Sequence, residues 1–240
     1  MASGRIDDFA IEGESYLTLG VIAKSEVFES SARIAILAKH IPQLNSSLSG
    51  LVPGLYHAVN DRKGKSKATP VDDLVGDIVD LSVHKEDHRV QFASILLLLQ
   101  LVQSEPSTST FHSTLLRLTS PPPTRLYSKF TSDPPTTRQD HPLLPLSSLS
   151  YAVQASRALS VERFNPMRYF QLHNDDSVSP YERIVLGWAQ DRVRERAWEV
   201  MKKAYMSMEL DWAVQWMHEE GKGWVKKRGG TLVDGVVKLR

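Results

Sequence analysis

A proline-rich stretch in the middle of the chain limits most strongly how this sequence can fold. Eight of the 13 prolines fall between residues 104 and 150, among many serines and threonines. Runs such as Pro121–Pro123 cannot lie inside a helix, because proline lacks the amide hydrogen and clashes with the preceding turn. The stretch predicts a linker between two ordered regions. The predicted segments are an N-terminal segment at 1–25, a helical-repeat region at 26–120, a Pro/Ser/Thr-rich linker at 121–145 and a C-terminal region at 146–240.

Two helices are predicted at the start of the first region. Apolar and small residues recur at helical spacing from about Ser25, and Pro42 ends this helix. The recurring residues are Val27, Ser31, Ile34, Ala35 and Ala38. Because Ser30, Ser31, Ala32 and Ala35 are small, a neighbouring helix can approach this one closely. A second helix carries Leu44, Leu48, Leu51 and Leu55, and Pro53 inside it should kink or shorten it. We expect the two to form an antiparallel pair.

Three further helices are predicted before the linker. Apolar residues recur at helical spacing within 71–79, 90–102 and 111–118. The helix at 90–102 is apolar nearly all round, so it should lie at the centre of the region. The basic segment 61–67 has no period and is expected to be a loop.

The C-terminal region should be helical and end in a hairpin. Leu149 to Leu159 form a helical stripe, and Asn165 before Pro166 is a helix start. Ser179 and Glu182 fit a capping box, from which one long helix should run to Tyr205, and a short helix follows at 210–217. Asp234-Gly235 between β-branched runs predicts a tight hairpin. The expected fold is mainly α, with right-handed helical repeats of the TPR/PCI-like kind and a C-terminal winged helix with a terminal β-hairpin.

The chemistry of most enzymes is missing from the sequence. Without cysteine, the chain can form no disulfide, thiolate metal site or cysteine nucleophile. Gly64-Lys65-Ser66 lacks the upstream glycine of a phosphate-binding loop, and His84 with His88 lacks a third metal ligand. We therefore expect no enzyme, no catalytic residue, no cofactor and no metal. An enzyme without a recognisable motif is the alternative.

Positive charge gathers at the C-terminal end. The whole chain has a net charge of +1, but residues 221–240 hold six basic residues against Asp234 alone. In a winged helix such residues flank the hairpin, where they can meet phosphates of RNA or DNA. A solvated surface is an equal alternative. The candidate nucleic-acid-binding residues are Lys222, Lys226, Lys227, Arg228, Lys238 and Arg240.

Aromatic residues are concentrated in the C-terminal region. Their helical spacing is typical of a core, and the alternative is that an exposed ring faces a partner protein. The candidate partner-binding residues are Trp198, Trp212, Trp216 and Trp224.

No segment predicts secretion or a membrane span. The first residues have neither a basic nor an apolar signal region, and the longest apolar run, near Ile95–Leu99, is far shorter than the roughly 20 residues that cross a bilayer. We expect a soluble protein of the nucleus or the cytoplasm.

Several segments resemble one family of helical scaffolds. Residues 27–37 read VFESSARIAIL and residues 164–172 read FNPMRYFQL, which is similar to the Sac-three/GANP domain. The runs 41–51, 155–159 and 192–205 also resemble its helix-packing motifs. KHIP at 39–42 and FHSTL at 111–115 are similar to the Nin-one-type subunit of the proteasome lid, which belongs to the same PCI-like superfamily.

The resemblance implies a non-enzymatic scaffold. Such domains pair with a PCI-domain protein and a small acidic stabilising subunit, and the joint surface binds nucleic acid in mRNA processing or nuclear export. The lid-type likeness implies the alternative, a structural subunit of the proteasome lid or of a signalosome-type particle. Both readings imply helical repeats that end in a winged helix.

Overall fold

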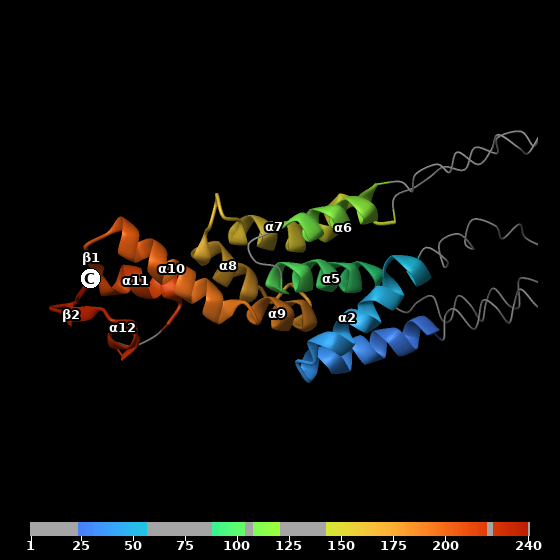
Figure 1. Cartoon of the computed structure of the whole chain (residues 1–240), viewed down its shortest axis with the longest axis horizontal. Coiled ribbons are helices and arrows are strands. Elements are labelled where there is room, and N and C mark those ends of the chain that lie inside the picture. The colour runs from blue at the N-terminus through green and yellow to red at the C-terminus, as the bar shows by residue number, and fades with distance from the viewer. Residues whose placement is uncertain (1–23, 57–87, 104–107, 121–142, 220–222, 240) are drawn as a thin grey trace, which may run out of the picture. The chain divides into compact units, whose positions relative to one another are not determined.

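The computed structural model describes residues 24–56, 88–103, 108–120, 143–219 and 223–239 (Figure 1). These residues are mainly helical, as predicted, and a small antiparallel sheet lies near the C-terminal end. The predictions for 61–67, for the helix at 71–79, for His84 and for most of the linker fall outside the described residues. No helix within the described ranges is both long and apolar enough to cross a membrane.

The chain forms two compact units. Unit 1 comprises residues 1–96 and 113–149, and unit 2 comprises 97–112 and 150–240. The division differs from the predicted one, because α5 (Arg89–Gln103) and α6 (Ser109–Thr119) each belong partly to both units.

The first two helices of unit 1 form the predicted antiparallel pair. The first covers residues 24–37, and the chain reverses at Lys39, which has a φ of 52°, before α2 (Ile41–Gly50). The His40 ring caps α2, since its Nδ1 accepts a hydrogen bond from the Gln43 amide (3.2 Å). Farther along, the Ser47 hydroxyl donates to Ser31 Oγ (3.0 Å).

Pro53 interrupts the second helix as predicted. A π-helical segment, η1 (Leu51–Leu55), follows α2, and within it Val52 has φ −116° and ψ 123°. The proline ring disfavours the α conformation of the preceding residue, which explains why the break falls at Val52.

The buried side of the first helix is not the predicted one. Ala32, Ala35 and Ile36 are buried, whereas Val27 and Ile34 are each 67% exposed. Of the predicted stripe, only Ala35 is in the core. The small residues reach α2 by hydrogen bonds through Ser31, and the apolar edge beside them is left open.

The central helix and the end of the linker are packed. In α5, side chains on nearly every side are buried, as predicted, and these include Phe92, Ala93, Ile95, Leu97, Leu98 and Leu99. Leu143 and Leu144, at the end of the predicted linker, are also buried, and the Leu144 amide donates to the Leu118 carbonyl of α6 (3.1 Å). The short η3 (Leu146–Leu149) leads into unit 2.

Unit 2 continues with two helices whose starts match the sequence pattern. These are α7 (Ser150–Leu159) and α8 (Pro166–His173). The Asn165 side chain caps α8 by accepting a hydrogen bond from the Arg168 amide (3.0 Å).

The predicted long helix is two helices. α9 (Pro180–Gly187) ends before Trp188, and α10 (Gln190–Ala204) starts after a turn. Gly187 lies so close to α8 that a Cβ there would be 2.9 Å from His173 Nε2. α9 starts where predicted, but Ser179 makes no side-chain capping hydrogen bond, so the capping box is not formed.

The last elements form a sheet with two helices inserted. After β1 (Ser207–Glu209) come α11 (Leu210–Met217), α12 (Gly223–Lys227), β2 (Thr231–Val233) and β3 (Val236–Lys238), at the red end of Figure 1. The strand order is β1-β3-β2, all antiparallel. Asp234 and Gly235 have φ values of 52° and 80°, which confirms the hairpin. β1 was not predicted.

Candidate functional site

A half-exposed group of rings is the most distinctive surface of unit 2. Trp212 and Trp216 lie one turn apart on α11, with ring centroids 5.0 Å from each other. Tyr205, at the end of α10, packs its ring edge-to-face on Trp212 at 5.2 Å and is 46% exposed. Both indoles also pack on the core of the unit. We call Tyr205, Trp212 and Trp216 the aromatic cluster.

The other two candidate tryptophans are core residues. Trp198 and Trp224 are 4% and 8% exposed and pack edge-to-face at 5.8 Å. Trp198 Nε1 also donates to the Arg228 carbonyl (3.1 Å), and Gly230 leaves room for its ring, since a Cβ there would lie 3.0 Å from it. Buried rings offer no surface to a partner, so the prediction for these two is corrected to a core role. Trp212 and Trp216 remain.

The candidate basic residues differ in their exposure and in their ion pairs. Lys226 and Lys227 are exposed on the last turn of α12. Arg228 is less exposed and pairs with Glu219 at 3.4 Å, and Arg194 pairs with the same carboxylate at 3.6 Å. The Arg228 guanidinium is therefore engaged within the unit, and its predicted role at a phosphate stays a prediction. Lys222 and Arg240 lie outside the described residues.

Lys238 lies on the outer face of the sheet. Val237 beside it is buried, so the alternation of strand side chains turns Lys238 outward. Its Cα partners in the two neighbouring strands are Ser207 and Thr231. The lysine therefore stands between two small polar residues, on a different element from the α12 lysines.

Three arginines of α10 hold the ends of three other helices, and none of the three was a predicted site residue. Arg192 donates to the Val102 carbonyl of α5 (2.7 Å), and Arg194 to the Met217 carbonyl of α11 (3.1 Å). Arg196 donates to Leu159 of α7 (3.0 Å) and lies over the Phe164 ring, 4.3 Å from its centre.

The geometry of these contacts explains the alternating arginines. The last carbonyls of a helix have no partner within it and carry partial negative charge, so a guanidinium there supplies both hydrogen bonds and charge. The planar fork of arginine reaches two successive carbonyls, as Arg194 does at Met217 and His218. We infer that the RVRER run is a structural clamp, not a ligand site.

A small polar pocket lies between α8 and α9. It has a volume of about 450 Å³ and contains the Arg183–Asp176 ion pair (2.6 Å). At its edge Asn174 joins His173 Nδ1 and His218 Nε2, each at 3.0 Å. Within the described residues no cluster of three or more His, Asp or Glu side chains could hold a metal ion.

The shifted groups near this pocket have structural causes. Burial raises the pKa of Tyr169 and of Tyr151 well above the usual range. Tyr169 donates to the Leu186 carbonyl (2.7 Å) and Tyr151 to Leu172 (3.2 Å), so both act as neutral hydrogen-bond donors. Hydrogen bonds from Ser177 lower the pKa of Asp175.

No model of a protein family matches this chain, and no curated protein matches it.

Proposed function

We propose that the chain is a non-enzymatic scaffold subunit that joins another protein through its C-terminal unit. The order α10-β1-α11-α12-β2-β3, with β1 added to the hairpin on the β3 side, supports a winged helix. The antiparallel helix pair of unit 1 supports helical repeats. Both features agree with the PCI-like resemblance of the sequence.

The aromatic cluster is the observation that carries this proposal. Partly exposed tryptophan and tyrosine side chains are the residues that most often dominate protein–protein binding. The cluster is held by the core on one side and is open on the other. Following the resemblance, we propose a PCI-domain protein as the partner, with a small acidic subunit, in nuclear mRNA processing or export.

Direct binding of RNA or DNA is the weaker part of the proposal. Of the six candidate basic residues, Lys226, Lys227 and Lys238 are described and free of the Glu219 network. Three lysines make a small electrostatic footprint. This observation favours the second candidate function, a structural subunit of the proteasome lid or of a signalosome-type particle in the cytoplasm or nucleus.

Purification of stable partners from the native cell tests the scaffold function. We expect the tagged chain to bring down a PCI-domain protein at constant ratio, and Tyr205→Ala to lose it at least tenfold. Val161→Ala, which changes another exposed apolar side chain of unit 2, is the matched control. Undiminished recovery with Tyr205→Ala, or recovery of no PCI-domain protein, contradicts the proposal. Co-sedimentation with proteasome or signalosome particles supports the alternative.

Salt-dependent RNA binding tests the nucleic-acid part. Lys226→Glu with Lys227→Glu should weaken binding of a single-stranded RNA and reduce the salt slope by about 1.4, because two phosphate contacts are lost. Arg157→Glu with Arg163→Glu reverses two exposed charges elsewhere in unit 2 and should leave the slope unchanged. If the two double variants reduce the salt slope equally, the α12 lysines are an ordinary solvated surface.

A further inference from the structure

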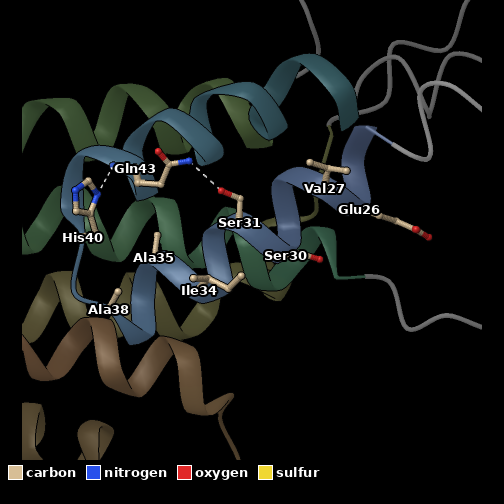
Figure 2. Close-up of a pocket in the computed structure, with 9 residues that line it drawn as sticks. All are labelled: Glu26, Val27, Ser30, Ser31, Ile34, Ala35, Ala38, His40 and Gln43. Carbon is tan, nitrogen blue, oxygen red and sulfur yellow. Dashed lines mark hydrogen bonds between the residues drawn. The ribbon is translucent and has the colours of Figure 1, made fainter.

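An open apolar groove runs along the first helix of unit 1. It has a volume of about 910 Å³ and lies over residues 26–38 and the turn into α2 (Figure 2). Val27 and Ile34 line it and are each 67% exposed. Leu37 on the same helix is also 67% exposed. Leu37 does not line the groove, but Val27 and Ile34 are two large aliphatic side chains exposed within it, which points to a surface that is normally covered.

The groove has the spacing of a two-helix seam. Counted from Lys24, its central residues follow at intervals of three and four, which is the a/d pattern of paired helices. These central residues are Val27, Ser31, Ile34 and Ala38. Large and small side chains therefore alternate along the seam. A partner helix must offer a small side chain opposite each large one, and a large side chain opposite each small one.

We propose that the groove binds a second copy of this chain as an antiparallel helix pair. In that arrangement Val27 of one copy faces Ala38 of the other, and Ile34 faces Ser31. Each layer then holds one large and one small residue, which keeps the distance between the helices uniform. In a parallel pair, Val27 would face Val27 and Ala38 would face Ala38, so the spacing would be uneven.

Charge at the two ends favours the same orientation. Glu26 lies at one end of the groove, and His40 lies at the other, next to the exposed Lys39. An antiparallel pair brings Glu26 of each copy to the His40 and Lys39 end of the other. A parallel pair would place the two Glu26 carboxylates together, which is unfavourable.

The polar residue at the centre of the groove, Ser31, tolerates being covered. Ser31 Oγ accepts hydrogen bonds from Gln43 Nε2 and from the Ser47 hydroxyl, both at 3.0 Å. The seam can close over Ser31 without leaving its oxygen unpaired. A single helix pair buries less than the roughly 1,600 Å² of a standard interface, so we expect a dimer that forms in the micromolar range.

The mass of the full chain in solution tests this proposal. Sedimentation equilibrium from about 1 to about 200 µM should show a monomer–dimer equilibrium, and Ile34→Glu should weaken it at least tenfold. Leu116→Glu changes a similarly exposed leucine of α6 and should leave the equilibrium unchanged. A monomer at all concentrations overturns the proposal, as does a dimer that Ile34→Glu leaves intact. A monomer whose melting temperature Ile34→Glu lowers would show that another segment of the same chain fills the groove.

Cysteine cross-linking tests the orientation, because the chain has no cysteine of its own. A disulfide requires Cα atoms within about 7 Å. A mixture of Val27→Cys and Ala38→Cys chains, one of them carrying a size tag, should oxidise to the mixed dimer. Cross-linking of each variant with itself, and not with the other, would show a parallel pair and overturn the proposed register.

Discussion

Unit 2 holds three of its helix ends with its own arginines, whereas the first helix of unit 1 leaves an apolar side open. In unit 2 three arginines of α10 reach the carbonyl ends of α5, α7 and α11, and the two central indoles are buried. In unit 1 the helix at 24–37 buries Ala32 and Ile36 but exposes Val27 and Ile34. The difference teaches that these helix ends of unit 2 are held by side chains of the same unit, whereas the described part of unit 1 offers an apolar face that something else should cover.

The largest expected effect is the loss of stability when a buried ring of unit 2 is removed. Trp198→Ala should lower the free energy of unfolding by about 3–5 kcal/mol, because it leaves a cavity in the core. It also removes the hydrogen-bond donor to the Arg228 carbonyl. Urea denaturation followed by circular dichroism measures this loss. Tyr205→Ala, at the half-exposed cluster, should cost less than half as much; equal losses would contradict the distinction between core and surface rings.

Two isoleucines on one helix test the open face of unit 1. Ile36→Ala should lower the free energy of unfolding by about 2–4 kcal/mol, since Ile36 is buried. Ile34→Ala changes the same residue type on the exposed side, and its effect should stay within about 0.5 kcal/mol. Urea denaturation at low micromolar concentration keeps self-association out of the comparison. Similar losses for both variants would show that the Ile34 side is covered within the chain.

The positions of the helices were predictable because their signals are local. The proline at 42, the kink before Pro53, the Asn165 cap and the Asp234-Gly235 turn each act on the nearest few residues. The hairpin and the central helix α5 were predicted for the same reason. Such local signals decide where an element starts and ends.

The buried face of an element depends on neighbours that are distant in the sequence. Helical period alone placed Ile34 inside, but the structure exposes it. The same kind of pattern left Trp198 open to a core or a partner role, and the structure buries it. The turn at Trp188 was missed because the apolar spacing continues through it; next to this turn, Gly187 lies close to the His173 side chain of α8. β1 has three residues, too few for a pattern, and the carbonyl ends that the α10 arginines bind lie up to 91 residues away.

Weakening the arginine clamp of unit 2 should give a smaller loss of stability. Arg196→Lys keeps the charge but loses the planar fork that meets the Leu159 and Ser160 carbonyls and the Phe164 ring. We expect a loss of about 1–2 kcal/mol in the free energy of unfolding. Arg157→Lys, an exposed arginine on α7, should change it by less than about 0.5 kcal/mol. If both substitutions are neutral in urea denaturation, the carbonyl contacts do not stabilise unit 2.

The smallest effect concerns the polar loop between α8 and α9, and it appears only with pH. The Ser177 hydroxyl (2.6 Å) and amide (3.0 Å) both donate to Asp175 Oδ1 and lower the pKa of this carboxyl in the folded state.

A carboxyl whose pKa is lower in the folded chain stabilises the fold at pH values above the unfolded pKa, near 3.9. That contribution disappears as the pH falls through the folded pKa. Asp175→Asn should therefore be less stable than the natural chain at about pH 6, and the gap should narrow toward pH 3. Because Asp175 lies partly exposed at the surface, solvent screens its charge and the gap should be the smallest of these effects; thermal melting across that pH range measures it. Ser177→Ala removes one donor and should reduce the same pH dependence; a gap that is constant from pH 6 to pH 3 would show that the loop gains nothing from the charge.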